Sequence, residues 1–131
     1  PQYLALHQAM KGELVSSCHA VTRGGLAVHL ALAAMGGALG ITLQLPLVPS
    51  APDLSNTRKL YSESCGRFII TVAPERQAPF EKCFSGMKFE KVGVVTEASD
   101  FVITGENGET ILKENIHRLK DLWKKPFGDL I

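Results

Sequence analysis

The sequence lacks the features that mark several classes of protein. It has 3 cysteines, Cys18, Cys65 and Cys83, and no two of them form a Cys-x-x-Cys pair. Neither a zinc site nor a disulfide framework is therefore indicated. Widely spaced single thiols are typical of a reduced compartment, so we expect a cytoplasmic protein without a metal site.

An excess of charge of one sign is also missing. The chain carries 14 basic and 13 acidic side chains, a net charge of +1, which gives no electrostatic reason to expect a nucleic-acid or membrane partner. The most apolar stretch, residues 26–45, is interrupted by His29, by glycines and by Gln44. A membrane span needs about 20 mostly apolar residues, so no membrane association is expected.

Apolar residues are present in the amount that a core requires. They make up 45% of 131 residues, which is enough for one domain without staples. The chain begins at Pro1 rather than at a methionine, and its first residues already have a helical pattern. We therefore expect residues 1–131 to be a single domain, a fragment of a longer multidomain chain.

The apolar periodicity predicts alternating helices and strands, followed by a hairpin and a final helix. Asn107-Gly108 predicts a tight hairpin turn with two positive φ angles. Ile116, Leu119, Leu122 and Trp123 form the apolar side of the final helix. This order predicts an α/β (α+β) fold with a mixed sheet and packed helices. The expected helices are 3–11, 26–35 (closed by Gly36, Gly37 and Gly40), 74–84 and 114–123; the expected strands are 14–21, 41–45, 67–72, 88–95, 101–104 and 110–112, with a loop at 46–56.

A first candidate site lies where an expected strand enters a Gly-Gly turn that opens a helix. Backbone amides at a helix N-terminus favour an anion, and glycine allows the anion to approach closely. The candidate ligand-binding residues are His19, Thr22, Arg23, Gly24 and Gly25. The pattern matches neither Gly-x-Gly-x-x-Gly nor a Walker A loop, so phosphate binding and plain strand–helix packing both remain open.

A second candidate site is the polar block before the strand at 67–72. Ser62 and Ser64 are suited to an anion, and Arg67 to a carboxylate or phosphate. Glu63 is suited to a magnesium ion or a substrate amine. A turn with capped ends explains the same residues equally well.

No catalytic residue can be named from the sequence. The histidines show no metal-ligand spacing with cysteine or glutamate, and no nucleophile–base–acid set is apparent. His29 lies inside an apolar helix, which indicates a core or interface residue. His7 and His117 are expected on the surface.

Read together, the two sites resemble motifs of the aminoimidazole-ribonucleotide-synthetase superfamily, C-terminal domain, and most closely of the phosphoribosylformylglycinamidine synthase family. Residues 18–27 resemble its His-Asp-x-Ser-(Asp/Glu)-Gly-Gly-Leu motif. Residues 60–68 resemble its Leu-Phe-Ser-Glu-Ser-x-x-Arg-Phe motif. Residues 92–95 resemble a late Ile-Gly-x-Val strand, and Trp123 with Pro126 resembles the closing helix.

This resemblance implies part of an ATP-dependent amidating ligase of purine biosynthesis. Formylglycinamide ribonucleotide, ammonia from glutamine, and ATP with magnesium would give formylglycinamidine ribonucleotide, ADP and phosphate. The implied partners are N-terminal ATP-binding domains of the same chain and a glutaminase subunit or domain. Because the ligands of such enzymes lie between domains, the isolated domain is expected to be inactive.

One departure concerns the first motif. Ala20 and Arg23 stand where the family has carboxylates, so this motif is expected to face a bare anion rather than a magnesium-bridged one. Two other functions remain open. The domain either belongs to a superfamily relative (aminoimidazole-ribonucleotide synthetase, thiamine-monophosphate kinase, selenide water dikinase or a hydrogenase-maturation protein) or is a non-catalytic structural half.

Overall fold

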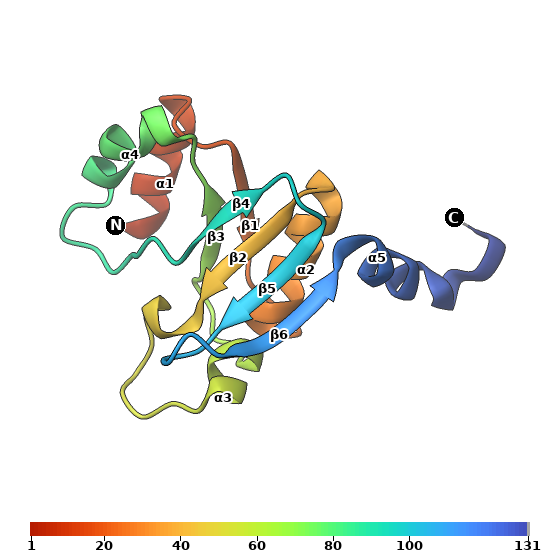
Figure 1. The fold of residues 1–131 in the computed structure, drawn as a ribbon. Helices are drawn as coiled ribbons and strands as arrows, with labels where there is room; N and C mark the ends of the chain where they lie inside the picture. Colours follow the sequence, from red (N-terminus) through yellow and green to blue (C-terminus); the bar gives the residue numbers. More distant parts are fainter. Residues whose placement is uncertain (131) are drawn as a thin grey trace.

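Two β-sheets and the helices packed against them make up residues 1–130, which the computed structural model describes (Figure 1). The larger sheet has the strand order β4-β2-β5-β6, and the smaller pairs β1 with β3. The main elements are α1 (Gln2–Lys11), β1 (Ser17–Ala20), α2 (Gly25–Gly37), β2 (Gly40–Gln44), α3 (Asn56–Tyr61), β3 (Phe68–Thr71), α4 (Gln77–Cys83), β4 (Gly93–Thr96), β5 (Asp100–Thr104), β6 (Thr110–Asn115) and α5 (Ile116–Lys124). Short 3-10 turns lie at Leu45–Leu47, Pro74–Arg76 and Lys125–Leu130.

The larger sheet is mixed. Strand β2 runs parallel to β5 and antiparallel to β4, and β5 runs antiparallel to β6. The predicted mixed sheet with packed helices is therefore confirmed. The separate two-stranded sheet was not foreseen, because strand pairing is not encoded in local periodicity.

Helix α2 covers one face of the larger sheet (Figure 1). Four of its side chains, Leu26, Ala27, Leu30 and Ala34, are buried in one cluster with alternate residues of β2 and β5. Burying a large apolar side chain contributes about 1.5–3 kcal/mol, so this cluster is the main source of stability. Its fully buried large residues are Leu45, Phe101, Ile103 and Ile116.

A second cluster lies between the smaller sheet and the helices α1 and α4. Ala5, Leu6 and Ala9 of α1 pack against Phe84 at the end of α4. Small residues on α1 let the two helices approach closely. Partly buried Phe68 and Ile70 of β3 extend this cluster to the sheet.

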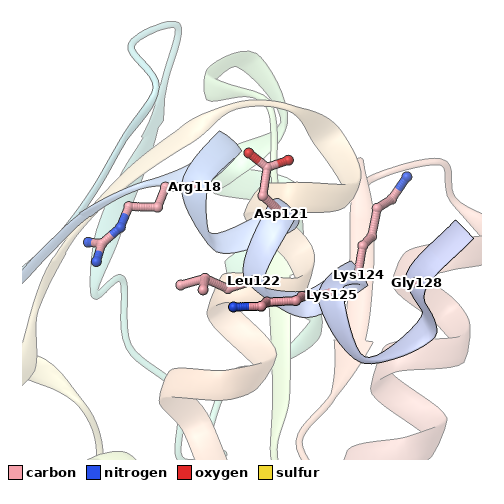
Figure 2. A pocket seen from close by; sticks show the side chains of 6 residues that line it. All are labelled: Arg118, Asp121, Leu122, Lys124, Lys125 and Gly128. Carbon is pink, nitrogen blue, oxygen red and sulfur yellow. The ribbon is translucent and has the colours of Figure 1, made fainter.

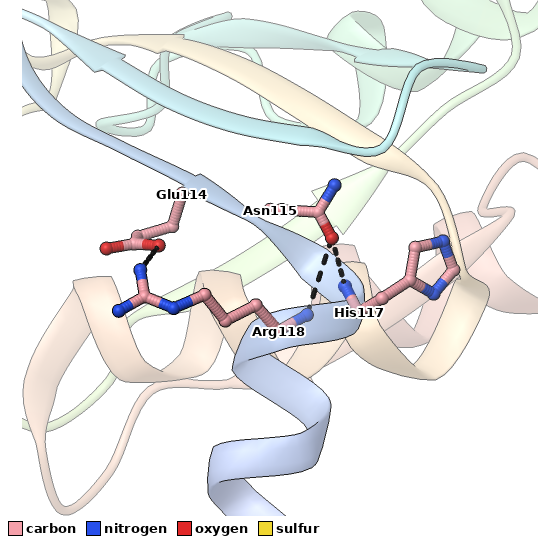
Figure 3. A network of polar contacts seen from close by, with 4 residues as sticks. All are labelled: Glu114, Asn115, His117 and Arg118. Carbon is pink, nitrogen blue, oxygen red and sulfur yellow. Dashed lines mark hydrogen bonds and ion pairs between the residues drawn. The ribbon is translucent and has the colours of Figure 1, made fainter.

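The junction between β6 and α5 is a capped helix start (Figure 3). The Oδ1 atom of Asn115 accepts hydrogen bonds from the amides of His117 and Arg118, at 2.9 and 3.4 Å. Arg118 also forms an ion pair with Glu114, which lies at the end of β6. The predicted start of this helix at Glu114 is therefore wrong, because Asn115 caps the helix one residue later.

Only the first half of α5 is packed against the domain. Ile116 is 1% exposed, whereas Leu122 and Trp123 are 52% and 53% exposed. The helix leaves the body of the domain towards its C-terminal end (Figure 1). Of the four residues predicted to form the apolar side of this helix, Ile116 and Leu119 pack against the main core.

Two glycine predictions need correction. Gly36 and Gly37 continue α2 instead of ending it, and Ala38 takes the left-handed conformation at the helix end, with φ of 53°. In the hairpin turn only Gly108 has a positive φ, of 75°. The amide of Gly108 donates to the carbonyl of Gly105 at 3.1 Å and closes a four-residue turn in which Asn107 is not left-handed.

The remaining differences concern segments with weak patterns. Residues 88–92 are not a strand, and β4 begins only at Gly93. The short helix α3, capped by Ser55, lies just after the predicted loop. No helix within residues 1–130 is long and apolar enough to cross a membrane.

Candidate functional site

The two candidate motifs lie next to each other because β1 and β3 are antiparallel. Ala20, at the end of β1, pairs with Phe68, at the start of β3. One residue further on, the amide of Val21 donates to the carbonyl of Arg67 at 2.9 Å. The Gly-Gly turn that follows β1 and the polar block that precedes β3 therefore meet at the same end of the smaller sheet.

Both glycines of the turn are required by the backbone. Gly24 and Gly25 have φ angles of 88° and 72°, which residues other than glycine rarely adopt. A Cβ atom on Gly25 would also lie 2.6 Å from the carbonyl carbon of Tyr61, at the end of α3. Gly25 therefore lets the start of α2 pack directly on the backbone of α3.

Glu63 binds the start of α2. Its Oε1 atom accepts a hydrogen bond from the amide of Gly24 at 2.8 Å. The amide of Gly25 donates to the carbonyl of Thr22 at 3.2 Å. Both amides therefore already have acceptors within the domain, although the sequence pattern indicated them as donors to an anion. The carboxylate lies at the positive end of the helix dipole, where an anion is favoured.

Arg67 organises the polar block. Its Nη2 atom donates to the carbonyl of Ser62, and its Nε atom to the carbonyl of Ser64 at 3.4 Å. The guanidinium thus holds the loop that carries Glu63. The structure gives Arg67 carbonyl partners within its own loop, in place of the carboxylate or phosphate foreseen from the sequence.

His29, which the sequence placed in the core or at an interface, also contacts this region. It is 7% exposed, as a core residue would be. Its Nδ1 atom lies 2.8 Å from Nε2 of His19, and the amide of Thr22 donates to its Nε2 at 3.0 Å. The spacing of ten residues between the histidines gives no motif signal, because a strand, a turn and a helix separate them.

Cys18 lies beside His19 on β1 and faces the second apolar cluster. Burial raises the pKa of its thiol, because the thiolate would lose its hydration there. A thiol held in its protonated form is a poor nucleophile. Cys18 is therefore a packing residue of the site's supporting strand.

The carboxylates of this region do not suit a magnesium ion. Within residues 1–130, no three His, Cys, Asp or Glu side chains gather as a metal site would require. Glu63 is the acid that contacts the Gly-Gly turn, and its Oε1 is engaged by Gly24. Ala20 and Arg23 offer no oxygen ligand from their side chains. Magnesium prefers several oxygen ligands, so we assign none to this loop.

Two surface hollows lie elsewhere on the domain. One, of about 410 Å³, lies along the end of α5 (Figure 2). Its lining has three cationic side chains and one acidic side chain, and consists of Arg118, Asp121, Leu122, Lys124, Lys125 and Gly128. The other, also of about 410 Å³, is formed by the loop at 46–53 with Lys59 and residues 88–90. Neither includes residues of the two motifs.

Comparison with known proteins identifies the family. Residues 1–106 match the family model described as "AIR synthase related protein, C-terminal domain". This chain belongs to that family. PurL, a phosphoribosylformylglycinamidine synthase subunit from Limosilactobacillus reuteri, is 37% identical over 125 residues, which are 95% of this chain and 16% of that protein. The chain thus spans a small part of its relative.

Solved structures of the family have the same fold. PurL from Thermotoga maritima complexed with ADP gives a TM-score of 0.81 at 20% identity, covering 90% of this chain and 21% of that one. The same protein complexed with FGAR gives 0.80 at 20% identity, over 90% and 20% of the two chains. The predicted superfamily and its C-terminal-domain fold are therefore confirmed.

Proposed function

We propose that this chain is the C-terminal domain of a phosphoribosylformylglycinamidine synthase, an ATP-dependent ligase of purine biosynthesis. We further propose that its Gly24–Gly25 turn forms one wall of a cleft for a phosphate-bearing ligand. The 37% identity to the L. reuteri subunit supports the parent enzyme. The ADP and FGAR complexes of the T. maritima protein support a ligand with phosphate groups.

The main support for the ligand site is the hydrogen bond that the carboxylate of Glu63 accepts from the amide of Gly24. A negative group already lies where the start of α2 offers a donor. A phosphate oxygen has the same charge preference and hydrogen-bond geometry as this carboxylate oxygen. Ligand binding would exchange one for the other, with Arg23 and His19 as further donors beside the turn.

The parent enzyme would convert formylglycinamide ribonucleotide, ammonia from glutamine, and ATP into formylglycinamidine ribonucleotide, ADP and phosphate. The carbonyl oxygen of the substrate leaves with the phosphate, and the ammonia nitrogen takes its place. In this reaction the present residues bind and orient an anionic group. The remaining cleft, the nucleotide-binding domains and the glutaminase would lie outside residues 1–131, so the isolated domain is proposed to be inactive.

The ligand site is tested by measuring the binding of ADP to the chain by calorimetry, without added metal. Arg23→Ala should weaken binding about tenfold, because a hydrogen bond between charged groups is lost. Glu63→Gln should strengthen binding, because the competing negative charge is removed. Lys124→Ala, remote on α5, serves as the control. Equal ADP affinity of the wild type and Arg23→Ala would contradict a phosphate contact at this turn.

A second function, a purely structural half of the parent enzyme, is favoured by one observation. The amide of Gly24 and the guanidinium of Arg67 already have partners within the domain. In that case ADP would not bind to the wild type. Arg67→Ala would then lower only the free energy of unfolding.

A further inference from the structure

Two histidine rings, His29 buried and His19 half-buried, are linked beside the Gly-Gly turn. His19 comes from β1 and His29 from the second turn of α2. Their ring centroids lie 4.9 Å apart, and Nε2 of His19 lies 2.8 Å from Nδ1 of His29. A hydrogen bond of this length needs one ring nitrogen to donate and the other to accept.

The backbone amide of Thr22 determines which nitrogen donates. An amide N–H can only donate, and it points at Nε2 of His29 over 3.0 Å. Nε2 of His29 must then carry a lone pair, so the proton of the neutral ring is on Nδ1. That proton is donated to Nε2 of His19. The neutral ring of His19 consequently carries its own proton on Nδ1.

The opposite arrangement is less favourable. Nε2 of His29 also lies 3.0 Å from the carbonyl of Arg23 and 3.1 Å from the hydroxyl of Thr22. A proton on Nε2 would satisfy the Arg23 carbonyl, but it would leave the Thr22 amide without its acceptor. The hydroxyl of Thr22 can rotate to suit either state, so it does not decide between them. In the Nδ1–H state the lone pair of Nε2 faces the Arg23 carbonyl, whereas in the Nε2–H state the Thr22 amide and the ring N–H face each other. Buried amides without an acceptor are rarer than carbonyls that lack a donor, which favours the Nδ1–H state.

From this geometry we infer that His29 is a positioning residue that holds His19 in its Nδ1–H tautomer. His19 then carries its N–H at its other nitrogen, and its ring lies against His29, which contacts Thr22 and Arg23 directly before the Gly-Gly turn. A donor suits a phosphate-bearing ligand, whereas a lone pair would repel one. The link to phosphate rests on the proposed function, but the tautomer itself does not.

Two substitutions of His29 separate its two hydrogen bonds. The amide nitrogen of asparagine falls near the position of Nδ1, so His29→Asn can still donate to His19. The oxygen of glutamine falls near the position of Nε2, so His29→Gln can still accept from Thr22 but loses the bond to His19. The glutamine variant is thus matched in polarity to the asparagine variant and differs only in which partner it keeps.

The tautomers are read from long-range nitrogen–proton NMR spectra of the imidazole rings in the full chain, at a pH where both rings are neutral. We expect wild-type His19 to show a protonated Nδ1 and an unprotonated Nε2. This pattern should persist in His29→Asn and change to a protonated Nε2 in His29→Gln. Wild-type His19 with a protonated Nε2 would overturn the inference, and so would an unchanged His19 in a folded His29→Gln variant.

Binding of ADP to the same proteins then separates this inference from the proposed function. If both are correct, His29→Gln weakens ADP binding about tenfold, as expected for one lost hydrogen bond to a charged group, and His29→Asn does not. If the tautomer changes but the wild type does not bind ADP, the phosphate site is wrong and the positioning role stands. The wild-type spectrum decides the tautomer even where a variant does not fold.

Discussion

The carboxylate of Glu63 accepts a hydrogen bond from the amide of Gly24, at 2.8 Å and across 39 positions of sequence. This bond joins the polar block before β3 to the start of α2. It also places a negative charge at the positive end of a 13-residue helix. The same bond stabilises the loop and lies where we propose that an anionic ligand binds.

Removing this bond should measurably weaken the domain. Glu63→Ala should lower the free energy of unfolding by about 0.5–2 kcal/mol, the usual range for a lost N-terminal cap. Glu63→Gln keeps an acceptor oxygen, so we expect a smaller loss. Urea unfolding measures both, with Glu106→Ala on the exposed hairpin as the control. Equal stability of Glu63→Ala and Glu106→Ala would contradict a capping role.

Gly25→Ala should be among the most harmful single substitutions. A Cβ atom there would overlap the backbone of Tyr61, and the φ of 72° is unfavourable for alanine. We expect a loss of roughly 2–4 kcal/mol, from overlap and backbone strain together. Gly36→Ala is the matched control, since nothing lies within 4 Å of its added Cβ. That variant should gain about 0.5–1 kcal/mol, as is usual for glycine inside a helix. Thermal unfolding measures both variants. Equal shifts of the unfolding temperature in Gly25→Ala and Gly36→Ala would contradict an overlap at Gly25.

The two halves of α5 should respond differently to truncation. Ile116→Ala should cost about 2–5 kcal/mol, because Ile116 fills the main core at 1% exposure. Leu122→Ala on the same helix should change stability by less than about 0.5 kcal/mol, since Leu122 is 52% exposed. Chemical denaturation of the two variants tests whether α5 docks only through its first turn. A large loss in Leu122→Ala would mean that the end of the helix is packed as well.

The raised pKa of Cys18 predicts a particular dependence of stability on pH. The folded state holds the thiol proton more tightly than the unfolded chain does, because burial disfavours the thiolate. The thiol of Cys18 therefore makes its full contribution to the free energy of unfolding below the pKa of the unfolded thiol, about 8.5. This contribution is lost as the pH rises through the pKa of the thiol in the folded state.

Cys18→Ala removes this contribution, so the wild type should lose more stability than the variant between roughly pH 8 and pH 10. Unfolding free energies at several pH values provide the measurement. Alkylation followed by mass spectrometry gives an independent check, because the exposed Cys65 should react before Cys18. Parallel pH curves for the wild type and the variant would contradict a buried thiol.

The sequence predicted those elements whose pattern is strong and local. The apolar run of α2 and the strands β2 and β5 lie within one or two residues of the expected bounds. The family motifs also gave the correct superfamily and fold. Short elements such as α3 were missed, because six residues carry too little periodicity to be distinguished from a loop.

The sequence named the residues of the two motifs but not the contacts between them. The sequence placed Gly24 and Glu63 in separate motifs, and only the pairing of β1 with β3 brings them together. It placed His29 in the core or at an interface without its link to His19, because a hydrogen bond between a strand and a helix leaves no regular spacing. Tertiary pairing, not local propensity, created each of these contacts.

The parallel pairing of β2 with β5 has a consequence for how the chain folds. The hydroxyl of Thr104 on β5 donates to the carbonyl of Leu43 on β2, 61 positions earlier. Closing so long a loop is entropically costly and slow, and β2 gains this central neighbour only after residues 101–104 have been synthesised. During translation the edge of β2 that faces β5 therefore remains unpaired, and unpaired strand edges promote aggregation. Prompt completion of the chain, or protection by a chaperone, is thus important for the yield of folded protein.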